Sequence, residues 1–501
     1  MTQRRVVNFR PLLFLTAALM AGIFACLFFL RNFSYFIWAL ATLAGMCLTA
    51  MLFKQKFTAL TVLFFMLGFS LHYIQHSNLV KLFDENQSYV MEGKIQKISD
   101  DKDGYNIILG DLKADGFAAG GKAVLRIEDE HPYKLYDRVK FLASVKNIQL
   151  DLSRSSSLAY YGSKVFYKAS LLQIISVSPS KLTFFEKLKL GMTSPMFEYL
   201  TPENAGVAQS LLTGDVSALD SQDLEAVRES GLSHIFAVSG LHISFVVMII
   251  TFLLKKLNTN PWINLAVVTT ALFIYCGVTG FPPSALRAFI MAVVFMLSLC
   301  LRKKYDALSS LSCACMALLL VSPLTLFSLS FIMSVCAVFG ILLYCPPIYK
   351  FLAGEKPSRL VRFVSVSIAL SVSANIFLLP ICVNVFGQVS VYFILSNLFV
   401  LPLVVCAYSY IFVCALFCLI SPALGILYYP ADFVLYGIRI VSQAIAVLPM
   451  ASVSVRGQVV LMAVYTLIMA IMSRYVMLSK YKKLSFGFAL LVFGVIAAAI
   501  F

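Results

Sequence analysis

The stretch SHIFAVSGLHIS (233–244) opens an apolar run that continues as FVVMIITFLL to residue 254. A run of this length can cross a bilayer as a helix. Its first half nevertheless carries two histidines, three serines and a glycine. Polar groups inside a membrane need hydrogen-bond partners from the protein itself. A single polar side chain there usually bonds to a neighbouring helix and helps the two helices to pack. The number of polar residues in this short stretch favours a helical membrane bundle with a cavity that polar side chains line.

The composition of the chain supports a membrane protein. Of its 501 residues, 60% are hydrophobic and 13% are charged, and the mean hydropathy is +0.87. Soluble proteins are about 45–50% apolar and about 25% charged. The net charge of +16 does not by itself indicate nucleic acid, because Lys and Arg accumulate in the cytoplasmic loops of membrane proteins. All twelve cysteines lie in apolar runs, which favours buried packing over a disulfide framework or a zinc site.

About thirteen apolar runs predict a polytopic α-helical protein. Residues 1–76 hold three N-terminal transmembrane helices, and residues 232–501 hold ten more. Alternate crossings place every basic cluster on one side, so we expect a multi-pass protein of the cytoplasmic (inner) membrane with a cytoplasmic N-terminus. The runs lie near 11–30, 33–53, 57–74, 232–254, 262–279, 284–301, 307–327, 330–349, 363–385, 391–419, 424–449, 457–473 and 484–501. Either one span or a re-entrant pair fits 391–419.

A polar insert interrupts these runs. Residues 77–190 contain β-rich stretches such as YVMEGKIQKI and DRVKFLASVKNI, separated by turn sequences such as DDKDG. They predict a small extracytoplasmic β domain. We expect residues 191–231 to form a polar helical linker back to the membrane. GFAAGGKA (116–123) resembles a phosphate-binding loop but has Ala123 in place of the magnesium-binding hydroxyl, so ATP binding is not expected.

The opening stretch and two later segments supply the candidate site residues. Ser239 and His242 are three apart and share a helical face, and Gly240 permits close approach or a local break. A serine beside a histidine also suggests an intramembrane serine hydrolase, but AVSGL lacks the first glycine of a G-x-S-x-G elbow and no acidic partner can be identified. Arg287 follows GFPPSAL at the outer end of its run, where it either snorkels to the headgroups or clamps a phosphate.

These motifs resemble the ComEC family, the inner-membrane channel of bacterial natural transformation. The family has a Leu-Gly-Asp segment followed by Gly, His and Ser-Gly-Leu-His, and later a Gly-Phe-x-Pro-Ser-x-x-Arg-Ala stretch. Segments 329–340 and 378–404 are also similar, so the resemblance covers roughly residues 200–405. The matching positions are Gly214, Asp215, Gly231, His234, Ser239, Gly240, Leu241, His242, Gly280, Phe281, Pro283, Ser284, Arg287 and Ala288.

The resemblance implies import of single-stranded DNA and an OB-type fold for the outer domain. Full-length members add a metallo-β-lactamase-like domain, and this chain has no H-x-H-x-D-H, so we expect a short form that is a channel and not an enzyme. It needs no cofactor or metal. Its expected partners are single-stranded DNA, membrane lipids, a separate DNA receptor, a cytoplasmic ATP-driven motor and a separate nuclease.

The residues divide into two roles under this hypothesis. Arg287 contacts a DNA phosphate, and the others line the channel with hydrogen-bonding groups or, for Gly240, with open backbone. The expected lining residues are His234, Ser239, Gly240, His242, Ser284, Gln388 and Asn397. A transporter of a lipid or small anionic solute remains an alternative, and an intramembrane serine hydrolase is a second one.

Overall fold

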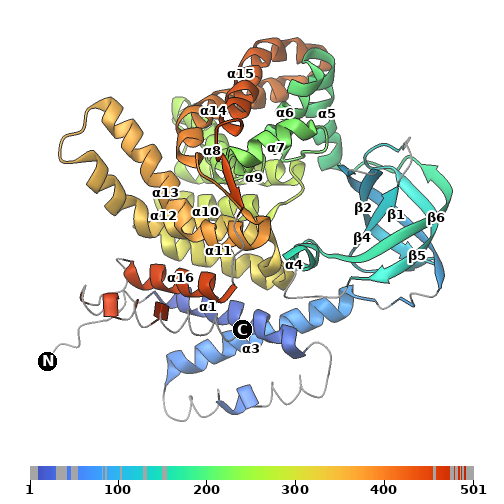
Figure 1. Cartoon of the computed structure of the whole chain (residues 1–501), viewed down its shortest axis with the longest axis horizontal. Helices are drawn as coiled ribbons and strands as arrows, with labels where there is room; N and C mark the ends of the chain where they lie inside the picture. The colour runs from blue at the N-terminus through green and yellow to red at the C-terminus, as the bar shows by residue number, and fades with distance from the viewer. Residues whose placement is uncertain are drawn as a thin grey trace. The chain divides into compact units, whose positions relative to one another are not determined.

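The computed structural model describes residues 10–29, 42–46, 55–81, 83–84, 87–101, 104–127, 133–148, 155–454, 459–473, 479, 483–485, 487 and 490–491. It divides into two compact units. One comprises residues 11–187 and 312–332, and the other is built mainly of residues 188–311 and 333–501. Most of the expected spans 33–53 and 484–501 lies outside the described residues. Figure 1 gives the labels of the elements.

The first unit begins with two apolar helices, α1 (Pro11–Cys26) and α3 (Lys56–Leu79). They pack backbone to backbone. A Cβ added to Gly22 would lie 2.0 Å from the carbonyl oxygen of Phe65, and one added to Gly68 would lie 2.3 Å from that of Leu19. Small residues are what allow membrane helices to approach this closely.

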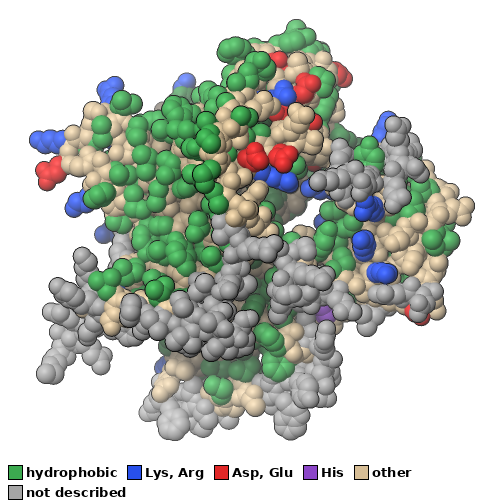
Figure 2. All heavy atoms as spheres, in the orientation of Figure 1, with side chains coloured by type: hydrophobic (Ala, Val, Ile, Leu, Met, Phe, Trp, Pro, Cys, Tyr) green, Lys and Arg blue, Asp and Glu red, His purple; other side chains and the backbone are tan. Residues whose placement is uncertain are grey.

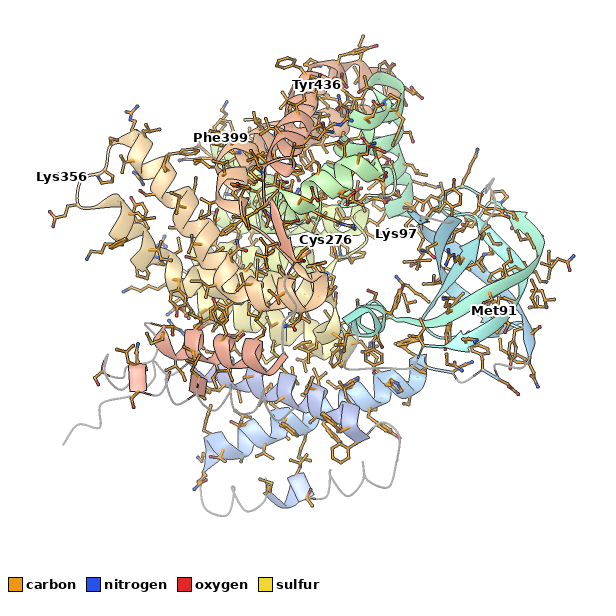
Figure 3. All side chains as sticks on the ribbon, viewed as in Figure 1. Met91, Lys97, Cys276, Lys356, Phe399 and Tyr436 are labelled. Atoms are coloured by element: carbon orange, nitrogen blue, oxygen red, sulfur yellow. The ribbon has the colours of Figure 1, made fainter. Side chains whose placement is uncertain are left out.

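Six strands follow and confirm the expectation of a small β domain. They are β1 (Ser88–Asp101), β2 (Gly104–Ala114), β3 (Phe117–Ala118), β4 (Lys122–Ile127), β5 (Arg138–Asn147) and β6 (Val165–Ser178). The pairings β1–β2, β2–β4, β4–β6, β6–β5 and β5–β1 close a barrel, in which only β4–β6 is parallel. Side chains alternate inward along the strands, and Ile107, Phe141 and Met91, the last of which is labelled in Figure 3, are buried.

Helix α4 (Ser155–Gly162) joins the barrel to the end of α3. The His72 ring on α3 contacts the Ile23 carbonyl through Nδ1 at 2.6 Å and the Tyr161 hydroxyl through Nε2 at 2.9 Å. Gly162 lies against the backbone of Phe327, in the short helix η3 (Pro323–Phe327), where a Cβ would be 2.3 Å from the carbonyl carbon. The barrel is therefore held to the helices of its own unit by buried contacts.

The second unit is helical. Its elements are α5 (Phe184–Tyr199), α6 (Pro202–Thr213), α7 (Ser221–Glu229), η2 (Ser233–Ile235), α8 (Gly240–Lys256), α9 (Pro261–Val278), α10 (Pro283–Cys300), α11 (Ala307–Val321), α12 (Leu329–Ala353), α13 (Arg359–Phe386), β7 (Gln388–Ser390), α14 (Phe393–Cys418), η4 (Pro422–Tyr428), α15 (Tyr429–Ala446), β8 (Ser452–Ser454) and α16 (Val459–Met472). Helices α5, α11 and α12 cross the division between the units. The segment expected to be a linker contains α6, in which residues 204–213 are all buried.

Eight helical segments in the described part of the chain are long and apolar enough to cross a membrane. The expectation of about thirteen spans is therefore met only in part. Helices α8, α11 and α16 have 17, 15 and 14 residues and are shorter than the apolar runs that predicted them. Residues 391–419 contain one helix, α14, that continues through Pro402. The chain therefore does not form a re-entrant pair there.

The glycine contact between α1 and α3 gives a first prediction. Replacing Gly68 with Val forces a side chain onto the Leu19 backbone, so we expect the free energy of unfolding to fall by roughly 1–3 kcal/mol. Gly437→Val is the matched control, because nothing lies within 4 Å of a Cβ at Gly437 on α15. Thermal unfolding of the detergent-purified protein measures both. Equal unfolding temperatures for the two variants would show that α1 and α3 do not meet at Gly68.

Candidate functional site

The segment from residue 232 to 239 is not the start of a long helix. Helix α7 ends at Glu229, Gly231 takes a positive φ of 78°, and a short turn, η2, follows. Ser239 is extended, with φ −123° and ψ 178°, and α8 begins only at Gly240. The predicted span 232–254 is thus wrong at its first eight residues. The reason is a helix cap that the sequence conceals, since a capping box normally has Glu or Gln where this chain has His242.

Ser239 and His242 form that capping box. The Ser239 backbone N–H donates to His242 Nδ1 at 3.1 Å, and the Ser239 hydroxyl accepts from the Leu241 N–H at 3.3 Å. The hydroxyl also lies 3.2 Å from Nδ1. Because Nδ1 accepts a backbone proton, a neutral His242 carries its own proton on Nε2. The pairing of serine with histidine is accounted for by this cap and needs no catalytic explanation.

The His242 ring also contacts Tyr408, which is hydrogen-bonded to Tyr275, and sequence reasoning missed both tyrosines. The ring meets Tyr408 on α14 edge to face, with centroids 4.5 Å apart and planes at 82°. The Tyr408 hydroxyl donates to that of Tyr275 at 3.1 Å, which donates to the Leu212 carbonyl at 3.0 Å. His242 and both tyrosines are buried. Their apolar surroundings in the sequence, ALFIYCGV and VVCAYSYIF, gave no signal of this chain of contacts.

Two residues of α10 complete the polar centre. The Ser284 hydroxyl donates to the Val238 carbonyl at 2.6 Å, and Arg287 Nη1 donates to the Ser334 carbonyl of α12 at 3.1 Å. Arg287 is 4% exposed, and its Nη2 lies beside Gly240, where a Cβ would be 3.6 Å away. The guanidinium therefore lies inside the bundle and does not extend along its surface. The phosphate contact stays a prediction that requires the bundle to open.

Two glycines bring neighbouring loops against the segment. Gly214 caps α6 with a φ of 75°, and a Cβ there would lie 3.0 Å from the Val238 side chain. Gly231 has a φ of 78°, and its Cβ would lie 2.9 Å from that of Ser390 in β7. Positive φ and close approach both favour glycine over any other residue. The segment is thus held between the α6–α7 loop and β7.

The remaining candidates lie apart from the capping box. Gln388 pairs with Ser454 in the small β7–β8 ladder. Asn397 Nδ2 on α14 donates to the Ser371 hydroxyl of α13 at 3.1 Å. His234 is exposed. The structure therefore brings together Ser239, Gly240, His242, Ser284 and Arg287. Gln388 and Asn397 have their partners in β8 and α13, and His234 acts on His242 only electrostatically.

A second polar network, also missed from the sequence, joins α6 and α7 to α15. Arg439 Nε on α15 donates to Asp223 Oδ2 on α7 at 2.6 Å, and Gln443 donates to Asp223 Oδ1 at 2.8 Å. Asn204 on α6 donates to Asp432 Oδ1 at 2.9 Å. The Asp223 side chain is 3% exposed. These contacts explain how the polar helices α6 and α7 pack within the helical unit.

Asp215, in the loop after α6, pairs with Lys189 on α5. The ammonium and carboxylate lie 2.6 Å apart, and the side chains are 14% and 11% exposed. Burial alone would raise the pKa of Asp215, but Lys189 and the Ser217 N–H stabilise the carboxylate and hold the pKa below its usual value. The ion pair fixes the loop whose Gly214 touches the Ser239 segment.

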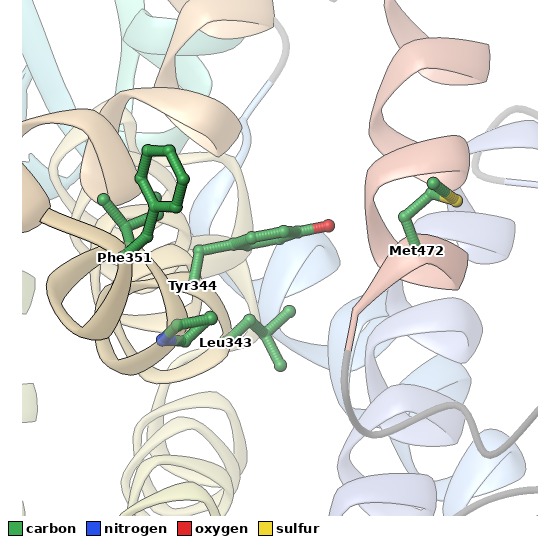
Figure 4. Close-up of a pocket in the computed structure, with 6 residues that line it drawn as sticks. Leu343, Tyr344, Phe351 and Met472 are labelled. Carbon is green, nitrogen blue, oxygen red and sulfur yellow. The ribbon is translucent and has the colours of Figure 1, made fainter. Parts of the chain in front are cut away.

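A cavity of about 390 Å³ elsewhere in the helical unit has a different character. It lies between α12 and α16 and is lined by Leu343, Tyr344, Pro347, Ile348, Phe351 and Met472 (Figure 4). Its walls are almost wholly apolar, and the Tyr344 hydroxyl already donates to the Met469 carbonyl at 2.5 Å. Such a lining suits hydrocarbon and does not suit a polyanion, so the cavity is not part of the candidate site.

The capping box leads to a prediction at Ser239. Ser239→Ala removes the acceptor for the Leu241 N–H and should lower the free energy of unfolding by about 1 kcal/mol. Ser239→Asn keeps an acceptor at the cap and should restore most of that loss. Thermal or denaturant unfolding in detergent tests both. An asparagine variant as unstable as the alanine variant would show that the cap is not what the serine supplies.

The ion pair leads to a pH-dependent prediction. A carboxyl whose pKa is lower in the folded than in the unfolded protein stabilises the fold above about pH 4 and loses that effect as the pH falls through its folded pKa. Asp215→Asn should therefore cost about 2 kcal/mol at pH 7 and progressively less below about pH 4. Asp220→Asn, at an exposed position, is the control. A cost for Asp215→Asn that does not change with pH would contradict the ion pair.

Comparison with known proteins places this site in a family. Residues 211–480 match the family model described as Competence protein. ComE operon protein 3 of Bacillus subtilis (strain 168) is 25% identical over 207 residues, which cover 40% of this chain and 25% of that protein. Uncharacterized protein YcaI of Escherichia coli (strain K12) is 26% identical over 216 residues, 40% of this chain and 28% of that protein.

The chain thus matches about a quarter of the length of these relatives, and no solved structure matches it. The family model covers more than half of the chain and includes every residue of the capping box, α10 and β7 described above. The ComEC-family resemblance seen in the sequence motifs is confirmed, and the chain belongs to the Competence protein family.

Proposed function

We propose that this protein is a channel of the cytoplasmic membrane that admits single-stranded DNA during natural transformation. The observation that carries the proposal is where the family match falls. Residues 211–480 contain the non-helical segment 232–239, its cap and the glycines that hold it. The match with the competence family therefore includes the buried polar centre together with the apolar helices around it.

The barrel also supports the proposal, in which it binds the incoming DNA strand. Its ring order β1-β2-β4-β6-β5, with one parallel pair, is that of a five-stranded OB-type barrel, a fold that binds oligonucleotides. Lys140 and Lys146 are exposed on β5. Basic side chains also gather on the face of the barrel seen in Figure 2. A basic surface that follows a phosphate backbone is what sequence-independent binding of a strand requires.

The channel is closed in this conformation. His242, Ser284 and Arg287 are 1%, 6% and 4% exposed, so a strand cannot reach them until the 232–239 segment moves. In the proposed open state these groups exchange their present partners for the strand, and Arg287 holds a phosphate bidentately. Gln388 and Asn397 line the pathway further along. Transport also requires a separate receptor, a cytoplasmic motor and a separate nuclease, with the barrel outside the cell and the N-terminus inside.

The test follows labelled double-stranded DNA in competent cells with and without the gene. Deletion should leave label outside the inner membrane unchanged and abolish label in the cytoplasm. Restoring the gene as Arg287→Ala should leave cytoplasmic label at least about tenfold below the wild type, since one lost charge-assisted contact is worth about 1.5–3 kcal/mol. Lys303→Ala is the control, because Lys303 is exposed beyond the other end of α10.

Two outcomes separate the parts of the proposal. Normal cytoplasmic label with Arg287→Ala, at an equal amount of inserted protein, removes the phosphate contact but leaves the channel. Unchanged cytoplasmic label after deletion removes the channel itself. A change in envelope lipids or solutes in that deletion strain would instead support a transporter of a lipid or small anionic solute.

A further inference from the structure

Two lysines meet at the end of the barrel nearest α3. The Lys122 N–H at the start of β4 donates to the Lys164 carbonyl at 2.8 Å, just before β6. Both side chains are half-buried. In the part of the chain that the structure describes, no carboxylate lies within ion-pair distance of either ammonium, and the Asp111 side chain acts on Lys122 only from further away.

The two charges are therefore poorly compensated. Burial lowers the pKa of Lys122, and repulsion from Lys164 lowers it further, while Asp111 opposes both effects. Burial also lowers the pKa of Lys164. An anion between the two ammonium groups would relieve this cost, because an opposite charge stabilises a half-buried cation. The geometry thus favours an anion at this end of the barrel.

The end of α3 near Lys122 and Lys164 indicates how deep these two lysines lie relative to the membrane. Helix α3 has 24 residues and is about 36 Å long, which exceeds the hydrocarbon core of a bilayer by about 6 Å. Its last residues, HYIQHSNL, are largely polar, so the excess lies at this end. The barrel touches α3 here, since a Cβ at Gly120 would lie 2.4 Å from the Leu79 carbonyl oxygen. We therefore place Lys122, two residues on, at the level of the lipid headgroups.

Aromatic side chains mark the same level. Phe117, at the tip of the β2–β3 hairpin, is 76% exposed, and Lys81 just beyond α3 donates to the carbonyl of the adjacent Ala118. Tyr160 on α4 is 40% exposed. Exposed aromatic residues beside lysines are typical of a surface that rests in the membrane interface.

We propose that Lys122 and Lys164 bind the phosphate of an anionic phospholipid, with Phe117 inserted beside it, so that the barrel is seated on the membrane where α3 ends. The inference does not depend on the proposed channel function. It gives the barrel a fixed height above the bilayer, which a domain held only by its chain connections would lack.

The test uses the full chain purified in an uncharged detergent. The wild type, Lys122→Gln/Lys164→Gln and the control Lys140→Gln/Lys146→Gln are titrated with phosphatidylglycerol, phosphatidylcholine, inorganic phosphate and single-stranded oligothymidylate. Affinity is read from the rise in unfolding temperature. We expect the first variant to bind phosphatidylglycerol at least about tenfold more weakly than the wild type, and the control variant to bind it equally well.

Three results would overturn the proposal. One is phosphatidylglycerol binding that the Lys122→Gln/Lys164→Gln change leaves intact. The second is a loss that falls on oligothymidylate alone, which would make the pair a nucleic acid contact. The third is inorganic phosphate bound as tightly as the lipid. If the double variant does not fold, Lys122→Gln and Lys164→Gln are tested singly, each with an expected loss of about threefold to fivefold.

Discussion

Backbone groups inside a membrane bundle have no water to bind, and the break in helix between residues 232 and 239 has to be satisfied by the protein itself. The chain meets this need with side chains. Ser284 binds the Val238 carbonyl, His242 binds the Ser239 N–H, and Tyr275 binds the Leu212 carbonyl at the end of α6. Each such group left unpaired would cost about 1–3 kcal/mol or more. The fold therefore uses these polar residues before any ligand can.

The same constraint explains the ion pair between α7 and α15. Removing one partner of a buried pair costs about 3–5 kcal/mol, because the other charge is left without compensation. Asp223 and Arg439 consequently stay paired, which fixes α7 against α15, and Gln443 satisfies the second carboxylate oxygen. Helices α6 and α7 become part of the helical unit, and the loop between them can position Gly214 against the 232–239 segment.

The sequence predicted what hydrophobic length and turn chemistry control. Among the described residues, most apolar runs became helices close to their expected bounds, and the β-rich insert became a barrel. The sequence-based prediction failed where a polar side chain takes a role that another residue type usually has. His242 at the third position of α8 hid the cap, so the start of α8 was placed too early. Tyr275 and Tyr408 read as ordinary apolar residues, because only the packing of α9 against α14 gives their hydroxyl groups partners.

The two histidines of SHIFAVSGLHIS, His234 and His242, have different environments. His242 is 1% exposed and is engaged by the Ser239 backbone, so its ring sets the start of α8. His234 lies in η2, within the break, and is exposed together with Ser233 and Ala237, while Ile235, Phe236 and Val238 are buried. The segment thus has one side fixed in the core and another side that is accessible. A ligand can meet His234 without disturbing a single hydrogen bond of the cap, whereas contact with His242 requires the cap to open.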